Sequence, residues 1–212
     1  MVIEGLYAGT AKTFGPRQES SAIVKQPQDS VVIEAQGIVT DTQADRRFHG
    51  GPHKALHQYS LVGYEILNKR FPLLHRSLHP GVLGENLTIA DMDDESVCIG
   101  DTYRMGEVVL QVSGPRIPCW KINHRLNWPD VDKFIAKRAI CGWYFRVLEG
   151  GTLQKGYSVE RTAQPHPGMS VASLVRVIYD QQASASLLSQ WATLPSLEPL
   201  WQERLAKRAD KT

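Results

Sequence analysis

The sequence predicts an α+β fold, in which a curved, β-barrel-like core with peripheral helices precedes a small unit of three helices. From Met1 to about Glu160, short β-like runs alternate with Gly and Pro, a pattern that favours a curved sheet or barrel over a parallel βαβ fold. After Pro167, three short apolar stripes follow helical spacing. We therefore expect one domain over residues 1–165 and a three-helix domain over residues 166–212.

The composition and the net charge indicate which classes of protein the chain can belong to. The 212 residues are 42% hydrophobic and 22% charged, as in an ordinary globular protein. Lys and Arg number 24 against 22 Asp and Glu, and this net charge of +2 argues against an overtly basic nucleic-acid-binding protein. No run approaches the ~18 apolar residues of a membrane span, and no secretory signal is visible. We expect a cytoplasmic protein that binds neither nucleic acid nor a membrane.

The strand predictions rest on short β-like runs between Gly and Pro residues. One hairpin is expected where Gly106-Glu107 separates Tyr103-Arg104-Met105 from the run that begins at Val108. The clearest strand candidates are Gly5–Gly9, Ser30–Ile33, Gly37–Thr40, Ser96–Ile99 and Val108–Val112.

The helix predictions rest on apolar spacing and on proline. The strongest helix is expected to begin at Pro52, to bury residues from Ala55 to Leu67, and to end at Pro72. A second helix is expected over Val131–Arg138. The three C-terminal helices would be marginal alone, so they must bury their stripes against one another or against the core. Because the candidate site residues all precede Gly151, we expect the chain to keep a folded core when it is stopped after Pro165.

Three cysteines stand singly, at Cys98, Cys119 and Cys141, and no C-x-x-C pair indicates a zinc knuckle or a redox pair. Cys119 lies in the stretch Ser113–Lys121, just after a predicted strand. Because Pro115 and Pro118 lack an N–H group, the chain must leave the sheet there and display Cys119 on a stiff loop. Neighbouring cations, Arg116 and Lys121, favour a reactive thiolate. For Cys119, a core cysteine on a proline-braced turn is the alternative. For Cys98 and Cys141, a buried core cysteine is the favoured interpretation.

A second stretch, His49-Gly50-Gly51-Pro52, leads into a predicted helix start. Its glycines allow close backbone approach to a ligand, and His49 and Lys54 would flank an anion there. A simple glycine-rich turn is the alternative. The spacing of His49, His53 and His57 also suggests a metal site. Of the three histidines, however, only His53 and His57 would share a helix face.

Two further polar residues are candidates for ligand binding. Asn86, in the turn of Gly84-Glu85-Asn86-Leu87, could hydrogen-bond an amide-rich heterocycle or close its own turn. Lys25 ends the apolar run of Ile23-Val24 and could contact an anion or remain a solvated lysine.

Taken together, these motifs resemble the MOSC domain, the family named for the C-terminal domain of molybdenum-cofactor sulfurase, and most closely its YiiM-type branch. The three short helices resemble the 3-alpha domain appended in that branch. The chain departs from the family pattern at Thr40, His53, Gly114 and Ile117. The resemblance rests on His49-Gly50-Gly51, Gly84-Glu85-Asn86-Leu87, Gly100-Asp101, Pro115-Arg116-x-Pro118-Cys119 and Gly142–Val147.

The resemblance implies a core that binds molybdenum cofactor (molybdopterin), with Cys119 as the metal ligand and the catalytic residue. Thiolate is a soft donor suited to such a metal. The cofactor phosphate needs cations or helix-start amides, and this sequence offers Lys25, His49, Lys54 and Arg116, with Asn86 as a further cofactor-binding residue. The implied activity is a reductase of N-hydroxylated purine or other base analogues, which converts N–OH to the amine and serves detoxification.

Electrons would come from a separate reductase, a flavoprotein, because the sequence shows no flavin or iron–sulfur motif. Two other function classes stay open. The chain could carry the cofactor, or sulfur on Cys119, without turning over a small substrate, or it could be a metal hydrolase that uses His49, His53 and His57. The sequence leaves the oligomeric state open, a homodimer included.

Overall fold

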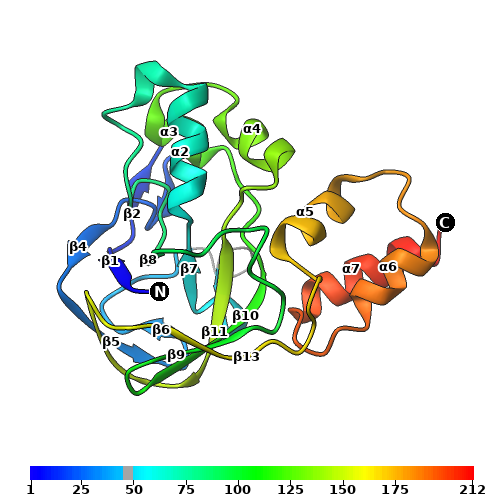
Figure 1. Ribbon diagram of the computed structural model, residues 1–212. Helices are drawn as coiled ribbons and strands as arrows, with labels where there is room; N and C mark the ends of the chain where they lie inside the picture. The colour runs from blue at the N-terminus through cyan, green and yellow to red at the C-terminus, as the bar shows by residue number, and fades with distance from the viewer. Residues whose placement is uncertain (45–49) are drawn as a thin grey trace.

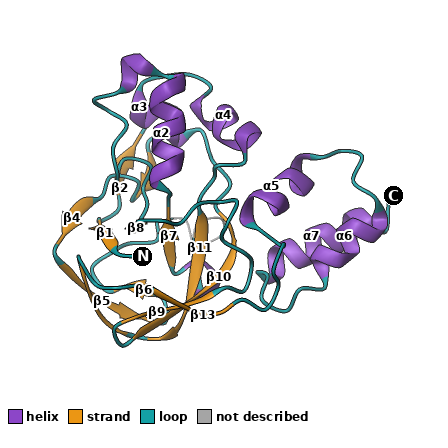
Figure 2. Ribbon diagram, viewed as in Figure 1, coloured by secondary structure: helices purple, strands orange, loops and turns teal. Residues whose placement is uncertain are grey.

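The computed structural model describes residues 1–44 and 50–212. One large curved sheet forms the body of the molecule, with a group of helices at one end and three C-terminal helices at its side (Figure 1). Coloured by secondary structure, the helices separate into these two groups, and loops and strands fill the space between them (Figure 2). The predicted mixture of sheet and peripheral helices is confirmed.

The large sheet has eight strands in the order β13-β9-β10-β11-β7-β8-β1-β4. All neighbours pair antiparallel except β7 and β8, which pair parallel. The order has two different ends, β13 and β4, so within the described residues the sheet curves without closing into a barrel. Its strands are β1 (Ile3–Ala8), β4 (Gln26–Gln28), β7 (Leu56–Gln58), β8 (Leu87–Ile89), β9 (Thr102–Met105), β10 (Val108–Pro115), β11 (Trp143–Glu149) and β13 (Glu160–Ala163).

The remaining strands form two smaller sheets. One has the order β12-β5-β6, formed by Gly151–Gln154, Ser30–Glu34 and Gly37–Ile38, and the other pairs β2 (Lys12–Phe14) with β3 (Glu19–Ser21). The predicted hairpin at Gly106-Glu107 is confirmed by the antiparallel pairing of β9 and β10. The predicted strand Ser96–Ile99 is wrong: this segment is a turn with a single bridge from Cys98 to Ser170.

The helix predicted to begin at Pro52 is wrong in its first half. Pro52–Lys54 forms only a short 3₁₀ turn (η1), and Leu56–Gln58 is strand β7, buried between β11 and β8. Helix α2 (Leu61–Arg70) begins later, where the Ser60 side chain accepts a hydrogen bond from the Gly63 amide. The apolar residues of this stretch satisfied helical spacing, but a central position in the sheet requires extended backbone.

The other helices follow prediction more closely. Helix α4 covers Val131–Arg138, as expected, and α3 (Lys121–Leu126) was not predicted. The three C-terminal helices are confirmed, and Ser170 and Ser184 cap the first two of them by accepting backbone amides. They are α5 (Val171–Tyr179), α6 (Ala185–Ala192) and α7 (Pro199–Ala209), and a second 3₁₀ turn, η2, covers Pro72–Leu74.

The C-terminal helices share their core with the sheet. One cluster of buried apolar residues joins sheet residues such as Leu110 and Trp143 to Leu174, Leu188 and Leu205 of the three helices. A second cluster lies beneath α2, α3 and α4. Cutting the chain after Pro165 would therefore expose the first cluster, which argues against the expected independent folding of residues 1–165. No helix within residues 1–44 and 50–212 is long and apolar enough to cross a membrane.

Candidate functional site

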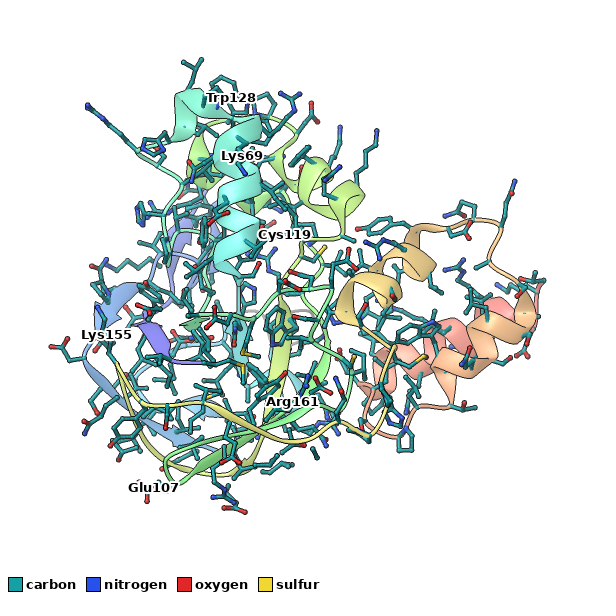
Figure 3. The ribbon with its side chains drawn as sticks, viewed as in Figure 1. Lys69, Glu107, Cys119, Trp128, Lys155 and Arg161 are labelled. Carbon is teal, nitrogen blue, oxygen red and sulfur yellow. The ribbon has the colours of Figure 1, made fainter. Side chains whose placement is uncertain are left out.

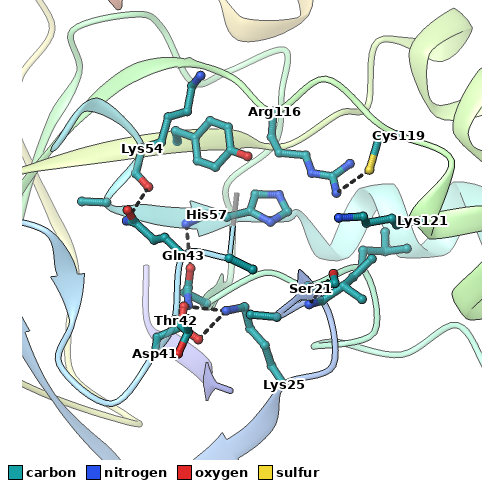
Figure 4. A pocket seen from close by; sticks show the side chains of 18 residues that line it. Ser21, Lys25, Asp41, Thr42, Gln43, Lys54, His57, Arg116, Cys119 and Lys121 are labelled. Atoms are coloured by element: carbon teal, nitrogen blue, oxygen red, sulfur yellow. Dashed lines mark hydrogen bonds and ion pairs between the residues drawn. The ribbon is translucent and has the colours of Figure 1, made fainter. Parts of the chain in front are cut away.

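A pocket opens where the strand ends, η1 and the start of α3 meet (Figure 4). Figure 3 places Cys119 near this junction between the helical end and the sheet. Among the described residues that line the pocket, four are basic and one is acidic, so the pocket suits an anion. They are Lys25, Lys54, Arg116 and Lys121, with Asp41 as the acid; His57, Asn86, Cys119 and Tyr144 also line it.

Cys119 lies on the loop that the prolines predict. Strand β10 ends at Pro115, which pairs with Trp143, and the Arg116 amide then donates to the Gly142 carbonyl at 3.0 Å. The loop carries Cys119 to the pocket, where the side chain is half-buried and not in a disulfide. In contrast, Cys98 and Cys141 are buried, as predicted. The described pocket therefore contains one thiol that a ligand can reach.

Arg116 is the charged neighbour of this thiol. Its Nη2 atom lies 3.9 Å from Cys119 Sγ, and the residue is only 6% exposed. Burial opposes the charge of the guanidinium, but the nearby Cys119, Tyr144 and Cys141 outweigh burial and raise the pKa of Arg116. A buried cation at this distance is placed to balance a negative charge on the sulfur.

Tyr144, on β11, lines the same pocket, close enough to Arg116 for the guanidinium charge to act on its hydroxyl. Burial raises the pKa of its hydroxyl well above the ordinary value, although the charge of Arg116 opposes the shift. Tyr144 therefore keeps its phenolic proton at neutral pH. The sequence analysis missed this residue because a tyrosine in a strand gives no local sign that it faces a pocket.

Lys25 is neither solvated nor available as an isolated cation, which corrects the alternative interpretation of this residue. Its Nζ atom lies 2.6 Å from both carboxylate oxygens of Asp41, and its side chain is 6% exposed. Burial lowers the pKa of Lys25, and Asp41 opposes this shift. Asn86 joins the network by donating to Asp41 Oδ2 at 2.9 Å and by accepting from the His57 amide at 3.0 Å. The side-chain hydrogen bonds of Asn86 thus join segments distant in sequence and hold the pocket wall.

Lys54 lines the pocket but is engaged by a distant residue. Its Nζ atom lies 2.8 Å from Glu198 Oε1, at the start of α7, and 6.0 Å from the centre of the Tyr144 ring. The predicted partner on the other side of this anion site, His49, lies outside the described residues. The interpretation of residues 49–54 as an anion site therefore stays a prediction.

Lys121 is a pocket cation that the sequence predicts only as a neighbour of the thiol and not as a cofactor-binding residue. It is the first residue of α3, and its Nζ atom lies 3.4 Å from the Ser20 carbonyl and 3.6 Å from Glu19. Its backbone position, two residues after Cys119, brings a second basic side chain to the thiol side of the pocket.

The predicted histidine pair on one helix face is wrong, because His53 lies in η1 and His57 in β7. Within the part of the chain that the structure describes, no three His, Cys, Asp or Glu side chains are grouped to hold a metal ion.

Comparison with known proteins identifies the family. The family model for the MOSC domain matches residues 45–160. The chain belongs to the MOSC domain family. The predicted resemblance is thereby confirmed. The matched residues include Cys119 and most of the residues that line its pocket.

Three relatives show how the match is distributed. YflK of Bacillus subtilis is 30% identical over 202 residues, which are 95% of this chain and 90% of YflK. YiiM of Escherichia coli is 30% identical over 156 residues, which are 73% of this chain and 69% of YiiM. A protein named "Reductase" from Gibberella moniliformis is 39% identical over 178 residues, 83% of this chain. This chain spans about a third of that reductase, 32% of its length.

Solved structures support the YiiM type of the fold. YiiM from Geobacillus stearothermophilus aligns over 98% of this chain and 99% of its own, with a TM-score of 0.82 and 28% identity. YiiM from Escherichia coli shares the fold over 100% of this chain and 94% of its own, with a TM-score of 0.82 and 20% identity. Both alignments include the C-terminal helices, so the three-helix unit is part of the shared fold.

Proposed function

We propose that this MOSC protein is a molybdenum-cofactor-dependent reductase of N-hydroxylated compounds, such as N-hydroxylated purine or other base analogues, with a detoxification role. One observation carries the proposal: a half-buried thiol, Cys119, faces a pocket rich in basic side chains, with a buried guanidinium 3.9 Å from its sulfur. The proposal places this chemistry in the cytoplasm, where thiols stay reduced.

The donor set fits the cofactor. A thiolate is a soft ligand, which suits a transition metal already held by sulfur, and a phosphate dianion needs charge-assisted hydrogen bonds from cations. Cys119 would be the metal ligand, and Arg116 and Lys121 are the basic side chains on its side of the pocket. Lys25 and Asn86, held by Asp41, and Lys54 would complete the cofactor site. When bound, the cofactor supplies a metal centre that accepts and passes on two electrons.

The chain's own residues position the reactants. Arg116 balances the charge of the Cys119 sulfur, and its burial excludes water that would screen this charge. Because burial keeps the Tyr144 hydroxyl protonated, Tyr144 can donate a hydrogen bond to an oxygen atom in the pocket. The N–OH oxygen of a substrate is the atom that needs such a donor, since it leaves as water.

The overall reaction consumes R–NHOH, two electrons and two protons, and yields R–NH₂ and water. The three cysteines stand singly in sequence, so they supply no cluster of thiolates for an iron–sulfur centre. We propose that a separate electron-donor reductase, a flavoprotein, delivers the electrons. The substrate partner is a small N-hydroxylated molecule.

Turnover tests the proposal. Protein made in cells that synthesise molybdenum cofactor is reduced with dithionite and given an N-hydroxylated purine. We expect the amine product from the native protein and none from Cys119→Ser, since an alkoxide substitutes poorly for a soft ligand. Cys98→Ser is the matched control, because it loses a buried thiol remote from the pocket lining and should retain turnover per folded molecule. Molybdenum without turnover in the native protein would favour the carrier function instead.

A further inference from the structure

The helical end of the molecule concentrates positive charge. Helices α2, α3 and α4 gather there, at one end of the large sheet (Figure 1). Residues 61–80 and 121–140, which form this end, contain eight Lys or Arg and three Asp or Glu, a net charge of +5. The whole chain carries only +2, so the rest of the molecule carries −3. The charge is therefore strongly asymmetric.

A groove crosses this basic end, between η2 and the start of α4. Its apolar lining comprises Phe71, Pro72, Leu73, Trp128, Pro129 and Phe134. Leu73 is 84% exposed, whereas Phe71 is buried and Trp128 and Phe134 are half-buried. Leu73 and the half-buried rings line one groove, so they form an apolar patch, and an apolar patch rimmed by polar side chains is typical of a surface that contacts another protein.

Basic side chains form the rim of the groove. The Arg70 guanidinium lies over the rings of Phe71 and Phe134, at 5.1 and 5.9 Å from their centres. Lys133 and Lys137 project from α4 and are exposed, and Lys133 forms an exposed ion pair of 2.7 Å with Asp130, the acidic side chain among the lining residues. An aromatic floor with a cationic rim is complementary to an acidic surface that carries an apolar side chain.

A short, rigid path joins this groove to the candidate site. Cys119 and Trp120 lead directly into α3, and at the other end of α3 the Trp128 amide donates to the Asn123 carbonyl at 3.0 Å. At 1.5 Å per residue, the six residues of α3 span about 9 Å between the thiol side of the pocket and the groove. Asn123 also holds α4 through Asp132, with hydrogen bonds of 2.8 and 3.0 Å. Cys119 and Trp128 mark the two ends of this path in Figure 3.

We propose that the groove lined by Leu73, Trp128 and Phe134 is the docking site for an acidic flavin protein that donates the electrons for reduction. The proposal rests on the proposed function, which needs two electrons from another protein. Docking there would bring the flavin to the end of α3 opposite the thiol. The basic rim attracts and orients the partner, and the apolar floor provides the close contact.

Reduced flavodoxin, a small acidic flavin protein, is the probe for this surface. The variants are Leu73→Asp and the double variant Lys133→Glu/Lys137→Glu, all on exposed side chains outside the candidate site. Lys155→Glu is the matched control, since this exposed lysine lies away from the groove (Figure 3). Binding of flavodoxin to each protein is measured by titration at low ionic strength. Turnover is measured with flavodoxin and, separately, with dithionite, which needs no docking site.

We expect both groove variants to weaken flavodoxin binding and raise its KM about tenfold or more, with a smaller difference at high salt. Turnover with dithionite should stay within about twofold of native in all variants, and Lys155→Glu should change binding little. Native protein that fails to bind flavodoxin, or groove variants that bind it as native does, would overturn the docking proposal. Binding of a DNA duplex through the same lysines would also overturn it. Absence of turnover with dithionite would instead contradict the proposed function.

Discussion

Glu198 Oε1 lies 2.8 Å from Lys54 Nζ, and both side chains are less than 10% exposed. This ion pair joins the start of α7 to the 3₁₀ turn that lines the pocket. The Glu198 amide also donates to the Ser113 carbonyl at 2.8 Å, and Ser113 Oγ in turn contacts the Tyr144 carbonyl at 3.0 Å. The three-helix unit is thus attached to the strands that carry the candidate site.

The first prediction concerns this attachment. Glu198→Ala should destabilise the protein by about 3–5 kcal/mol, because it leaves the Lys54 ammonium buried without its carboxylate. Glu203→Ala is the matched control on the same helix, where an exposed pair with Lys207 contributes little. Urea denaturation of the two variants measures the difference. Equal stability of both variants would show that the buried pair contributes nothing to folding.

The second prediction concerns the length of the chain. Stopping it after Pro165 should give an insoluble or partly unfolded protein, because Leu174, Leu188 and Leu205 then leave the cluster they share with the sheet. Expression and thermal unfolding of the truncated chain check this. A soluble truncated protein with a cooperative transition near the native Tm would restore the view of residues 1–165 as an independent domain.

The third prediction separates the basic residues of the pocket. Arg116→Ala should reduce molybdenum retention roughly ten- to a hundredfold, through loss of a charge-assisted hydrogen bond of about 1.5–3 kcal/mol. Lys25→Ala should weaken retention and also lower Tm, because it leaves Asp41 buried without its cation. Molybdenum occupancy and Tm are measured for each variant. His53→Ala is the control, since His53 is not among the pocket residues; unchanged occupancy in both basic variants would place the anion elsewhere.

The fourth prediction concerns pH. Asp94 is buried and accepts a hydrogen bond from the Gly142 amide at 2.7 Å. Burial raises the pKa of Asp94 from 3.8 to about 7, and the amide opposes this shift. Between pH 4 and 7 the folded protein therefore holds a proton that the unfolded chain has lost, so this residue makes stability fall as pH rises. Above about pH 7 its contribution is constant.

Asp94→Asn removes this effect and keeps an oxygen for the Gly142 amide. The Tm of the variant relative to native should rise steadily from about pH 4 to pH 7 and then level off. Asp91→Asn, at an exposed position, should show no such trend. A native-minus-variant difference that does not change with pH would contradict the buried, protonated state of Asp94.

Local rules in the sequence predicted the features that depend on neighbouring residues. Pro115 is the last paired residue of β10 and Pro118 lies in the loop beyond it, so the two prolines marked the exit of the chain before Cys119, and the helix expected over Val131–Arg138 has those bounds. The same rules gave a wrong prediction for the stretch after Pro52. Its apolar residues satisfied a helical period, while the register of β7 between β11 and β8 decided the structure.

The site partners could not be predicted because they are distant in sequence. Asp41 reaches Lys25 across 16 residues, and Glu198 reaches Lys54 from a different structural unit. Lys25 and Lys54 therefore looked like free cations, and only the folded chain shows that each is held by a carboxylate. Family resemblance supplied what local chemistry could not, since the pocket is lined by segments that range from β3 to β11.

The molybdenum content of the purified protein tests the central claim most directly. Native protein and Cys119→Ala are made side by side in cells with intact cofactor synthesis, and each is analysed for molybdenum and zinc. We expect close to one molybdenum per native chain, almost none in Cys119→Ala at an unchanged Tm, and no stoichiometric zinc in either. Native protein without molybdenum, or equal molybdenum in both proteins, would contradict the assignment of Cys119 as the ligand of the cofactor.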